Sequence, residues 1–209
     1  MSVLLKLLNG YLLQNIKQPM LDKQYMKKLH TSFHAYASVR RDVIKVAGDA
    51  LHHAKRAIFD MHRDDMKAAA AKLKQSEGLL KALQKKHKNH PAMKSEGAYR
   101  AAVEEYVEAS LFHQFVTRGS IGKVAAFSVE EEVFLAGMCD VPGELYRYAI
   151  RAASRGNKKT VEDCEKMSSE IIGSLIEFDL TKYLRTKFDQ AKQAHQKLEI
   201  VIYELSMRA

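Results

Sequence analysis

The feature that most constrains the fold is a row of apolar residues at helical spacing between Gln24 and Arg63. The row consists of Leu29, Phe33, Tyr36, Val43, Ala47, Ala50, Ala54, Ile58 and Met61. Steps of three, four and seven residues place these side chains on one side of a single long helix. We expect a helix of this length to pack in a helical bundle or against a second copy of the chain.

The rest of the chain also favours helices, because turn signals are few, with only ten glycines and three prolines in 209 residues. We expect further helices over residues 64–88, 95–118, 128–156, 161–183 and 185–207. Ser128 with Glu131, and Thr160 with Asp163, have the spacing of helix-capping pairs. With a helical N-terminal segment, the pattern predicts an all-α fold, a single-domain bundle of about seven helices.

The first 22 residues form a leucine-rich segment that we expect to be helical, and residues 23–209 form the main helical domain. Lys6, Asn9 and Gly10 interrupt the leucines well before a membrane-spanning length, so no transmembrane span is expected. The segment also lacks a basic leader and a clear small-residue cleavage site, which argues against a signal peptide. An amphipathic helix covering the core or a neighbouring subunit fits better than attachment to a membrane surface.

Composition narrows the choice of partner and compartment. The 34 Lys and Arg residues exceed the 25 Asp and Glu residues, and the formal net charge of +9 favours nucleic acid or anionic lipid as partner. The two cysteines, Cys139 and Cys164, lie within helix-like sequence, so we expect buried thiols in a reducing compartment, the cytoplasm. The chain contains no P-loop, no G-x-G-x-x-G and no G-x-S-x-G motif.

Carboxylates interrupt two rows that otherwise face the core. In the helix expected over residues 95–118, Glu105 and Glu108 share a row with Ala98, Ala101, Phe112 and Phe115. In the next helix, Asp140 and Glu144 share a row with Val133, Gly137 and Tyr148. Pro142, between these two acids, removes a backbone donor and favours a kink in the helix.

A buried, unpaired carboxylate costs several kcal/mol, so such acids need basic partners, protonation or a metal ion. Oxygen-only ligation suits Mg²⁺ or Mn²⁺, which in phosphodiester cleavage orients water, lowers its pKa and stabilises charge on the phosphate. Glutamates at these spacings are also common on solvated helix faces, so the pattern alone leaves a purely structural role open.

A basic row follows the long helix expected over residues 24–63. Its members recur at four- and seven-residue intervals and therefore lie on one face: Arg41, Lys45, His52, Arg56 and Arg63. Such a face suits the phosphate backbone of a nucleic acid. A solvated basic face directed at acidic neighbours remains the alternative.

Two other all-α metal-dependent classes fit less well. Ferritin-like di-iron proteins need Glu-x-x-His pairs, and none of the nine histidines has a glutamate three residues before it. All-α nucleotide pyrophosphatases use acid pairs at i, i+3 spacing, whereas Asp140 and Glu144 are four residues apart.

Four segments resemble the translin family, and specifically its translin-associated factor X branch. They are HHAKRAIFDMHR (52–63), EEYVEASLFHQF (104–115), CDVPGELYRYAI (139–150) and KLEIVIYELSMR (197–208). The resemblance extends in order and spacing from about Tyr36 to Ala209, which leaves the leucine-rich N-terminus outside it. It implies a translin-like bundle of seven helices, closed hollow oligomers and RNA handled on a basic inner surface.

The resemblance also implies an activity. In that branch the acids of the E-Y-V-E and D-x-x-G-E segments form the Mg²⁺-dependent site of an endoribonuclease that cleaves single-stranded RNA. They correspond to Glu105, Glu108, Asp140 and Glu144, of which we expect the last three to bind Mg²⁺ or Mn²⁺. We expect Glu105, or another of the four, to position or deprotonate the attacking water.

The expected partners are single-stranded RNA or single-stranded DNA, further copies of the chain and, where one exists, a separate translin protein. The alternative function is a non-catalytic translin-like scaffold that binds single-stranded RNA or DNA through the basic face. A pure anion binder gains nothing from four negative charges facing its ligand, which favours the nuclease.

Overall fold

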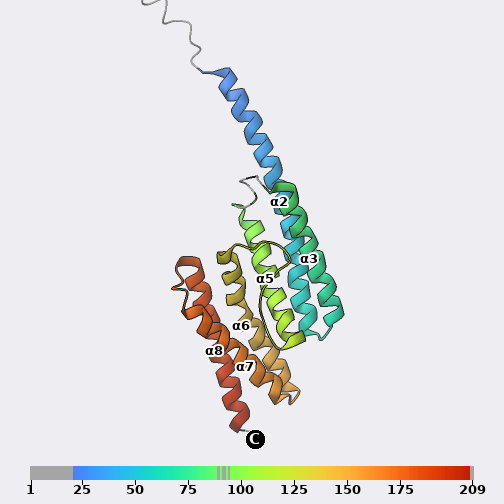
Figure 1. Cartoon of the computed structure of the whole chain (residues 1–209), viewed down its shortest axis with the longest axis vertical. Coiled ribbons are helices and arrows are strands. Elements are labelled where there is room, and N and C mark those ends of the chain that lie inside the picture. The colour runs from blue at the N-terminus through green and yellow to red at the C-terminus, as the bar shows by residue number, and fades with distance from the viewer. Residues whose placement is uncertain (1–20, 89, 91–92, 94, 208–209) are drawn as a thin grey trace, which may run out of the picture. The chain divides into compact units, whose positions relative to one another are not determined.

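The computed structural model describes residues 21–88, 90, 93 and 95–207, and in them it contains six α-helices and no β-strand (Figure 1). The helices are α2 (Lys23–His62), α3 (Met66–His87), α5 (Gly97–Arg118), α6 (Glu131–Ser154), α7 (Lys158–Ile176) and α8 (Lys182–Met207). This confirms the predicted all-α class. The leucine-rich stretch lies almost entirely outside the described residues. In the described part, no helix combines the length and apolar character needed to cross a membrane.

The beginnings of the first two helices follow ordinary capping chemistry. The Asp22 carboxylate accepts hydrogen bonds from the backbone N–H groups of Gln24 and Tyr25, at 2.9 and 3.0 Å. Asp65 caps α3 by accepting from the N–H of Ala68 at 2.9 Å. In both helices an aspartate satisfies an N–H group that has no partner within the helix.

Both capping pairs expected later in the chain were wrong. Helix α6 begins only at Glu131, so Ser128 lies before the helix and its carbonyl instead accepts from the Gln84 amide at 2.9 Å. Helix α7 begins at Lys158, where the Asn157 side chain accepts from the N–H of Thr160 at 3.1 Å. The helix starts before Thr160, so Asn157 is the N-cap and Thr160 lies within the first turn.

Helix α7 is also shorter than the predicted 161–183. It ends at Ile176, and positive φ angles follow at Asp179, 46°, and at Lys182, the first residue of α8, 49°. A left-handed backbone at two nearby positions is incompatible with a continuous α-helix.

Contact density divides the chain into residues 1–38 and 39–209. In the described part of the first unit, α2 exposes large apolar side chains: Tyr25, Met26, Leu29, Phe33 and Tyr36. The predicted boundary between residues 22 and 23 remains a prediction.

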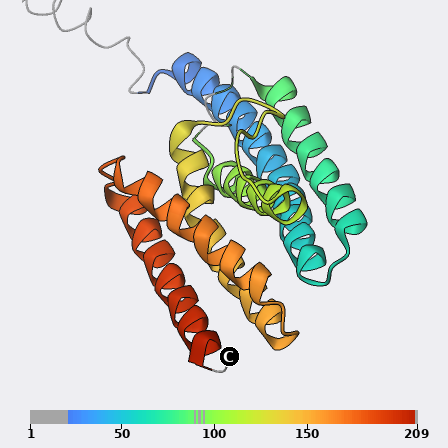
Figure 2. The same ribbon diagram turned by 60° about the horizontal axis from the view of Figure 1, so that its bottom comes forward.

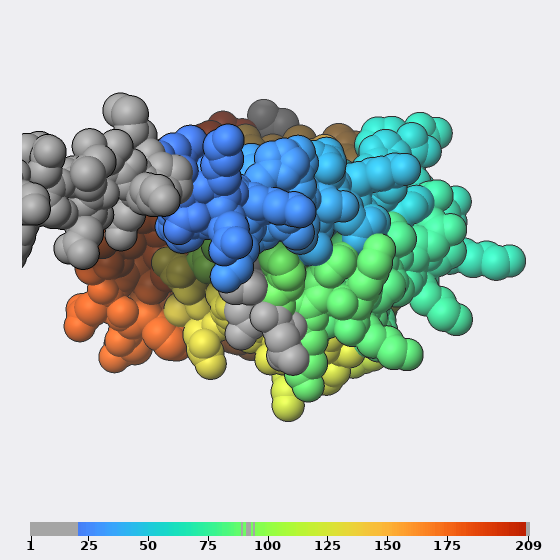
Figure 3. All heavy atoms as spheres, turned by 90° about the horizontal axis from the view of Figure 1, so that it is seen from above, coloured from blue at the N-terminus to red at the C-terminus, as the bar shows by residue number. Residues whose placement is uncertain are grey.

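Within the second unit, α6 is the central helix and packs against α5, α7 and α8, while α3 packs against α5. Helices α7 and α8 run antiparallel beside each other on α6 (Figure 2). The segment between α5 and α6 comes to the surface beside α5 (Figure 3). The largest fully buried side chains come from α2, α3, α5, α6, α7 and α8 and include Met61, Leu80, Phe112, Leu145, Ile171 and Leu198.

A glycine sets the distance between α5 and α6. A Cβ atom at Gly137 would lie 2.6 Å from the Glu104 carbonyl oxygen and 2.9 Å from the Val107 Cβ, so only glycine allows this approach. Helix α6 also continues from Glu131 to Ser154 through the buried Pro142. The carboxylates on either side of that proline therefore stay on one continuous helix, closely opposed to α5.

We predict that Gly137→Ala destabilises the protein by about 1–3 kcal/mol, because the methyl group meets α5 backbone that cannot turn aside. Gly143→Ala on the same helix is the control, since a Cβ there meets no atom within 4 Å. It should be neutral or stabilise by about 0.5–1 kcal/mol through higher helix propensity. Urea unfolding followed by circular dichroism measures both, and equal effects would contradict close packing at Gly137.

Candidate functional site

The four carboxylates predicted from the sequence lie together, at the contact between α5 and α6. The charges of Asp140, Glu105 and Glu144 all act on Glu108, which is itself only 8% exposed. Glu104, which was not predicted, joins the group from α5. These five residues are called the acidic cluster below.

Glu108 is the member with the greatest need for a cation. Among the residues that the structure describes, nothing forms a hydrogen bond or ion pair with its carboxylate. Burial first, and then repulsion from Asp140, Glu105 and Glu144, raises its pKa well above the usual glutamate value. A cation placed here would offset both effects.

Lys187 of α8 connects the two helices of the cluster. Its Nζ lies 2.5 Å from Asp140 Oδ2 and 2.6 Å from Glu104 Oε1, and its side chain is 16% exposed. One turn earlier, the Tyr183 hydroxyl donates to Glu104 Oε1 at 2.8 Å. Burial alone would lower the pKa of Lys187, but its hydrogen bonds to Asp140 and Glu104 outweigh burial and raise that pKa.

Glu144 has an arginine neighbour on its own helix and a histidine neighbour on α2. Arg147 donates to Glu144 Oε1 at 2.9 Å, and the buried His62 ring contacts Glu144 Oε2 through Nε2. Burial would raise the pKa of Glu144, but His62 and Arg147 outweigh it and hold the pKa below the usual value. The His62 ring is fixed against Phe112, with the ring centroids 5.2 Å apart.

Lys55 of α2 approaches the remaining predicted acid, with its Nζ 3.6 Å from Glu105 Oε2. Burial is nevertheless the largest effect on Glu105, and its pKa is raised. Lys55 and His62 are seven residues apart and thus lie on one side of α2. That side of α2 faces the acidic cluster.

The donor chemistry of the cluster fits a hard divalent cation, because it offers carboxylate oxygens, and among the described residues the buried Glu108 carboxylate has no hydrogen bond or ion pair. The side chains as they stand are nevertheless turned toward cations of the chain. Within the described residues, no three His, Cys, Asp or Glu side chains are grouped so that they could hold a metal ion. The predicted ligand set of Glu108, Asp140 and Glu144 therefore remains a prediction.

All five members of the predicted basic row are exposed: Arg41, Lys45, His52 and Arg56 on α2, and Arg63 directly after its end. The guanidinium groups of Arg56 and Arg63 lie 6.0 and 5.4 Å from the centroid of the half-exposed Phe59 ring. By helical periodicity this row is next to the side that carries Lys55 and His62. A strand bound along the row would border the acidic cluster.

Sequence reasoning missed several residues of this site, among them Glu104, His62 and Lys187. Glu104 precedes Glu105 and falls off the helical row that identified the other acids. His62 lies one residue before the predicted Arg63 and belongs to the buried side of α2. Lys187 is one lysine among many, and only the packing of α8 on α6 reveals it.

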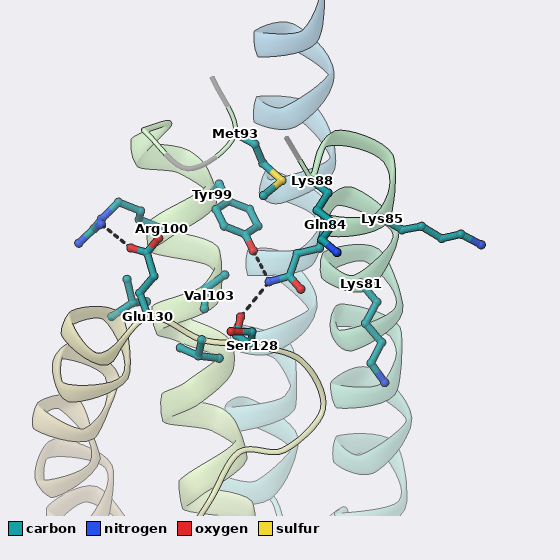
Figure 4. Close-up of a pocket in the computed structure, with 12 residues that line it drawn as sticks. Lys81, Gln84, Lys85, Lys88, Met93, Tyr99, Arg100, Val103, Ser128 and Glu130 are labelled. Carbon is teal, nitrogen blue, oxygen red and sulfur yellow. Dashed lines mark hydrogen bonds and ion pairs between the residues drawn. The ribbon is translucent and has the colours of Figure 1, made fainter. Parts of the chain in front are cut away.

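A cavity of about 580 Å³ lies elsewhere, between the end of α3, the start of α5 and the segment before α6 (Figure 4). In the wall of this cavity the Gln84 side-chain amide donates hydrogen bonds to the Tyr99 hydroxyl, at 2.8 Å, and to the Ser128 carbonyl. None of the acidic-cluster residues lines it. Buried charge, and not cavity size, therefore identifies the candidate site.

We predict opposite effects on stability for two substitutions in the cluster, measured in EDTA at neutral pH. Glu108→Gln removes a carboxyl group whose ionised form is disfavoured by burial and by three neighbouring acids, and it should raise the melting temperature. Glu104→Gln leaves Lys187 with one partner fewer and should destabilise by about 1–3 kcal/mol. Calorimetry compares the two, and a destabilising Glu108→Gln would mean that the Glu108 carboxylate has a counterion after all.

Comparison with known proteins places this fold. A family model described as the Translin family matches residues 38–209. Three solved structures are similar. "Crystal structure of AfC3PO" has 22% sequence identity and a TM-score of 0.81, and the match covers 88% of this chain and 98% of that chain. "Structure of AfC3PO - duplex RNA complex" has 21% identity and a TM-score of 0.78, with 88% of this chain and 97% of that chain covered, and "Crystal structure of apo-NeC3PO" has 21% identity and a TM-score of 0.78, with 89% and 98% covered. A search of curated protein sequences gave no match. Since the family model spans most of the sequence, the chain belongs to the translin family.

Proposed function

We propose that the protein is a metal-dependent endoribonuclease of the translin-associated factor X type, which cleaves single-stranded RNA with Mg²⁺ or Mn²⁺. One observation carries the proposal: among the described residues nothing forms a hydrogen bond or ion pair with the carboxylate of the buried Glu108, and three further acids predicted for the site act on it. A cluster that only supported the fold would gain stability by replacing Glu108 with an uncharged residue. Retaining this charge is a cost that a metal-binding role explains.

In this proposal Glu108, Asp140 and Glu144 would hold the metal ion. When bound, the ion would lower the pKa of a water molecule and neutralise charge on the phosphate. Glu105 would accept the proton of the attacking water, and its raised pKa brings it closer to the pH at which a general base acts well. His62 and Arg147 would orient Glu144 by hydrogen bonding to its two oxygens.

The basic row on α2 would bind the RNA backbone. Phosphates along Arg41, Lys45, His52, Arg56 and Arg63 would pass beside Lys55, which faces the acidic cluster. The exposed Phe59, flanked by Arg56 and Arg63, would stack on a base. AfC3PO, which shares the fold, is described in a complex with duplex RNA, which supports RNA as the ligand class.

We further propose that the protein works as a hollow homo-oligomer in the cytoplasm, beside a translin protein where one exists. Self-association is supported by large apolar side chains that remain exposed in the single chain: Phe33 on α2, and Ile200, Tyr203 and Met207 on α8. A soluble monomer rarely leaves such clusters in water. The free, buried Cys139 and Cys164 fit a reducing compartment.

The second candidate, a scaffold that binds single-stranded RNA or DNA without cleaving it, is favoured by basic side chains of the chain that already contact the acids. Lys55, Lys187 and His62 each contact one of the predicted acids. Ion pairs of this kind would let the acids serve as braces between helices. Cleavage assays separate the two functions.

We predict that the purified protein cuts end-labelled single-stranded RNA in Mg²⁺ and not in EDTA. Glu108→Gln should reduce the cleavage rate by at least about 100-fold, because it removes a charged ligand at the reacting centre. Asp163→Asn, at an exposed acid on α7, is the control and should cleave like the wild type. Denaturing gels measure the rates, and filter binding in EDTA checks that the variants still bind RNA. Bound but uncut RNA under every metal would establish the scaffold.

Affinity for RNA should depend on the basic row. We predict that Arg56→Ala with Arg63→Ala weakens binding and reduces the slope of log affinity against log salt by about 0.7 for each phosphate that is no longer neutralised. Lys158→Ala with Lys159→Ala, two exposed lysines on α7, makes the same change in net charge elsewhere. Fluorescence anisotropy in EDTA over a salt series compares the pairs. Equal decreases in affinity would assign the effect to total charge instead of to this row.

A further inference from the structure

We propose that Lys187 is a resident counter-cation of the acidic cluster that holds the cluster together without metal and lowers its affinity for a divalent cation. The inference rests on the proposed metal-binding function and adds a residue of α8 that regulates metal binding at that site. It is based on the position of the Lys187 ammonium group between Asp140 and Glu104.

Lys187 connects two acids of the cluster that lie on different helices. Its ammonium contacts Asp140 from α6 and Glu104 from α5, at 2.5 and 2.6 Å, and its charge also acts on Glu108. A divalent cation that uses Asp140 and Glu108 as ligands would have to approach this same position. A bound divalent cation and the Lys187 ammonium group would repel each other, so each weakens the binding of the other.

The surroundings of Lys187 hold it in place. Its side chain is 16% exposed, and the Tyr183 ring lies 5.6 Å from its Nζ. The Tyr183 hydroxyl in turn donates to Glu104, so the lysine and one of its partners are positioned from the same helix. Lys187 is therefore unlike Lys55, whose side chain is 60% exposed and 3.6 Å from its acid.

Removal of the Lys187 charge would have opposite effects without and with metal. Without metal, it leaves Asp140 and Glu104 without a cationic partner in the buried contact between α5, α6 and α8. With metal, the same removal takes away a competing charge. The uncharged variant should therefore be less stable than the wild type in EDTA and should bind the metal more tightly.

The test uses the full chain and titrates Mn²⁺, and separately Mg²⁺, by isothermal calorimetry into the wild type and Lys187→Met. We expect about tenfold tighter binding by Lys187→Met, together with a larger rise in melting temperature on adding metal. Lys187→Arg keeps the charge and should bind like the wild type. Lys192→Met is the matched control on α8, because Lys192 pairs with Asp189 and not with the acidic cluster.

The outcomes separate this inference from the proposed function. Metal binding to the wild type that is unchanged or weakened in Lys187→Met would overturn the role of Lys187 and leave the metal site intact. Binding only by Lys187→Met would support the inference in its strongest form. No binding by either protein would overturn the metal site and the inference with it. If Lys187→Met fails to fold, Lys187→Met with Glu104→Gln removes one charge of each sign and answers the same question.

Discussion

Five carboxylates meet where α5, α6 and α8 come together, and burial disfavours the ionised form of a carboxyl group. The cluster persists because the surrounding helices supply basic or hydrogen-bonding side chains: Lys187 from α8, Lys55 and His62 from α2, and Arg147 from α6. The charge balance of the acidic cluster therefore depends on how the helices pack. A displaced α8 would leave Asp140 and Glu104 without Lys187, and a displaced α2 would leave Glu144 without His62.

The close approach of α5 and α6 determines how near the acids of the two helices lie to each other. Gly137 lets the two helices meet at the level of Glu104, one turn from Glu108 and one turn from Asp140. A larger residue would separate the helices and weaken the repulsions between the acids of α5 and those of α6. The position is therefore both a packing device for the core and a determinant of the electrostatics of the candidate site.

The fold class was predictable because the patterns that identify helices involve residues close together in the sequence. Apolar periodicity and sparse turn residues identified the helices, and acids that interrupted apolar rows identified Glu105, Glu108, Asp140 and Glu144. Cap residues were less predictable, since Ser128 and Thr160 have suitable partners in sequence but lie away from the true helix starts. Several residues compete for each helix start, and tertiary packing decides among them.

The contacts of the acids were not predictable from the sequence. Lys187 and Asp140 are 47 positions apart, and His62 and Glu144 are 82 apart. No periodicity joins positions on different helices, so a lysine that balances a buried acid reads like any solvated lysine. The sequence predicted that such acids need basic partners, protonation or a metal ion, but it did not identify which side chains would be the partners.

Helix α2 joins the two halves of the proposed function. One side of it gives His62 and Lys55 to the acidic cluster, and the adjoining face exposes the basic row that would hold a polyanion. Because both sides belong to one rigid helix, a strand bound along the row would have a fixed position relative to Glu105 and Glu108. A loop could not fix that position, since its backbone moves independently of the core. The long helix that most constrains the fold would then also set where the RNA lies relative to the carboxylates.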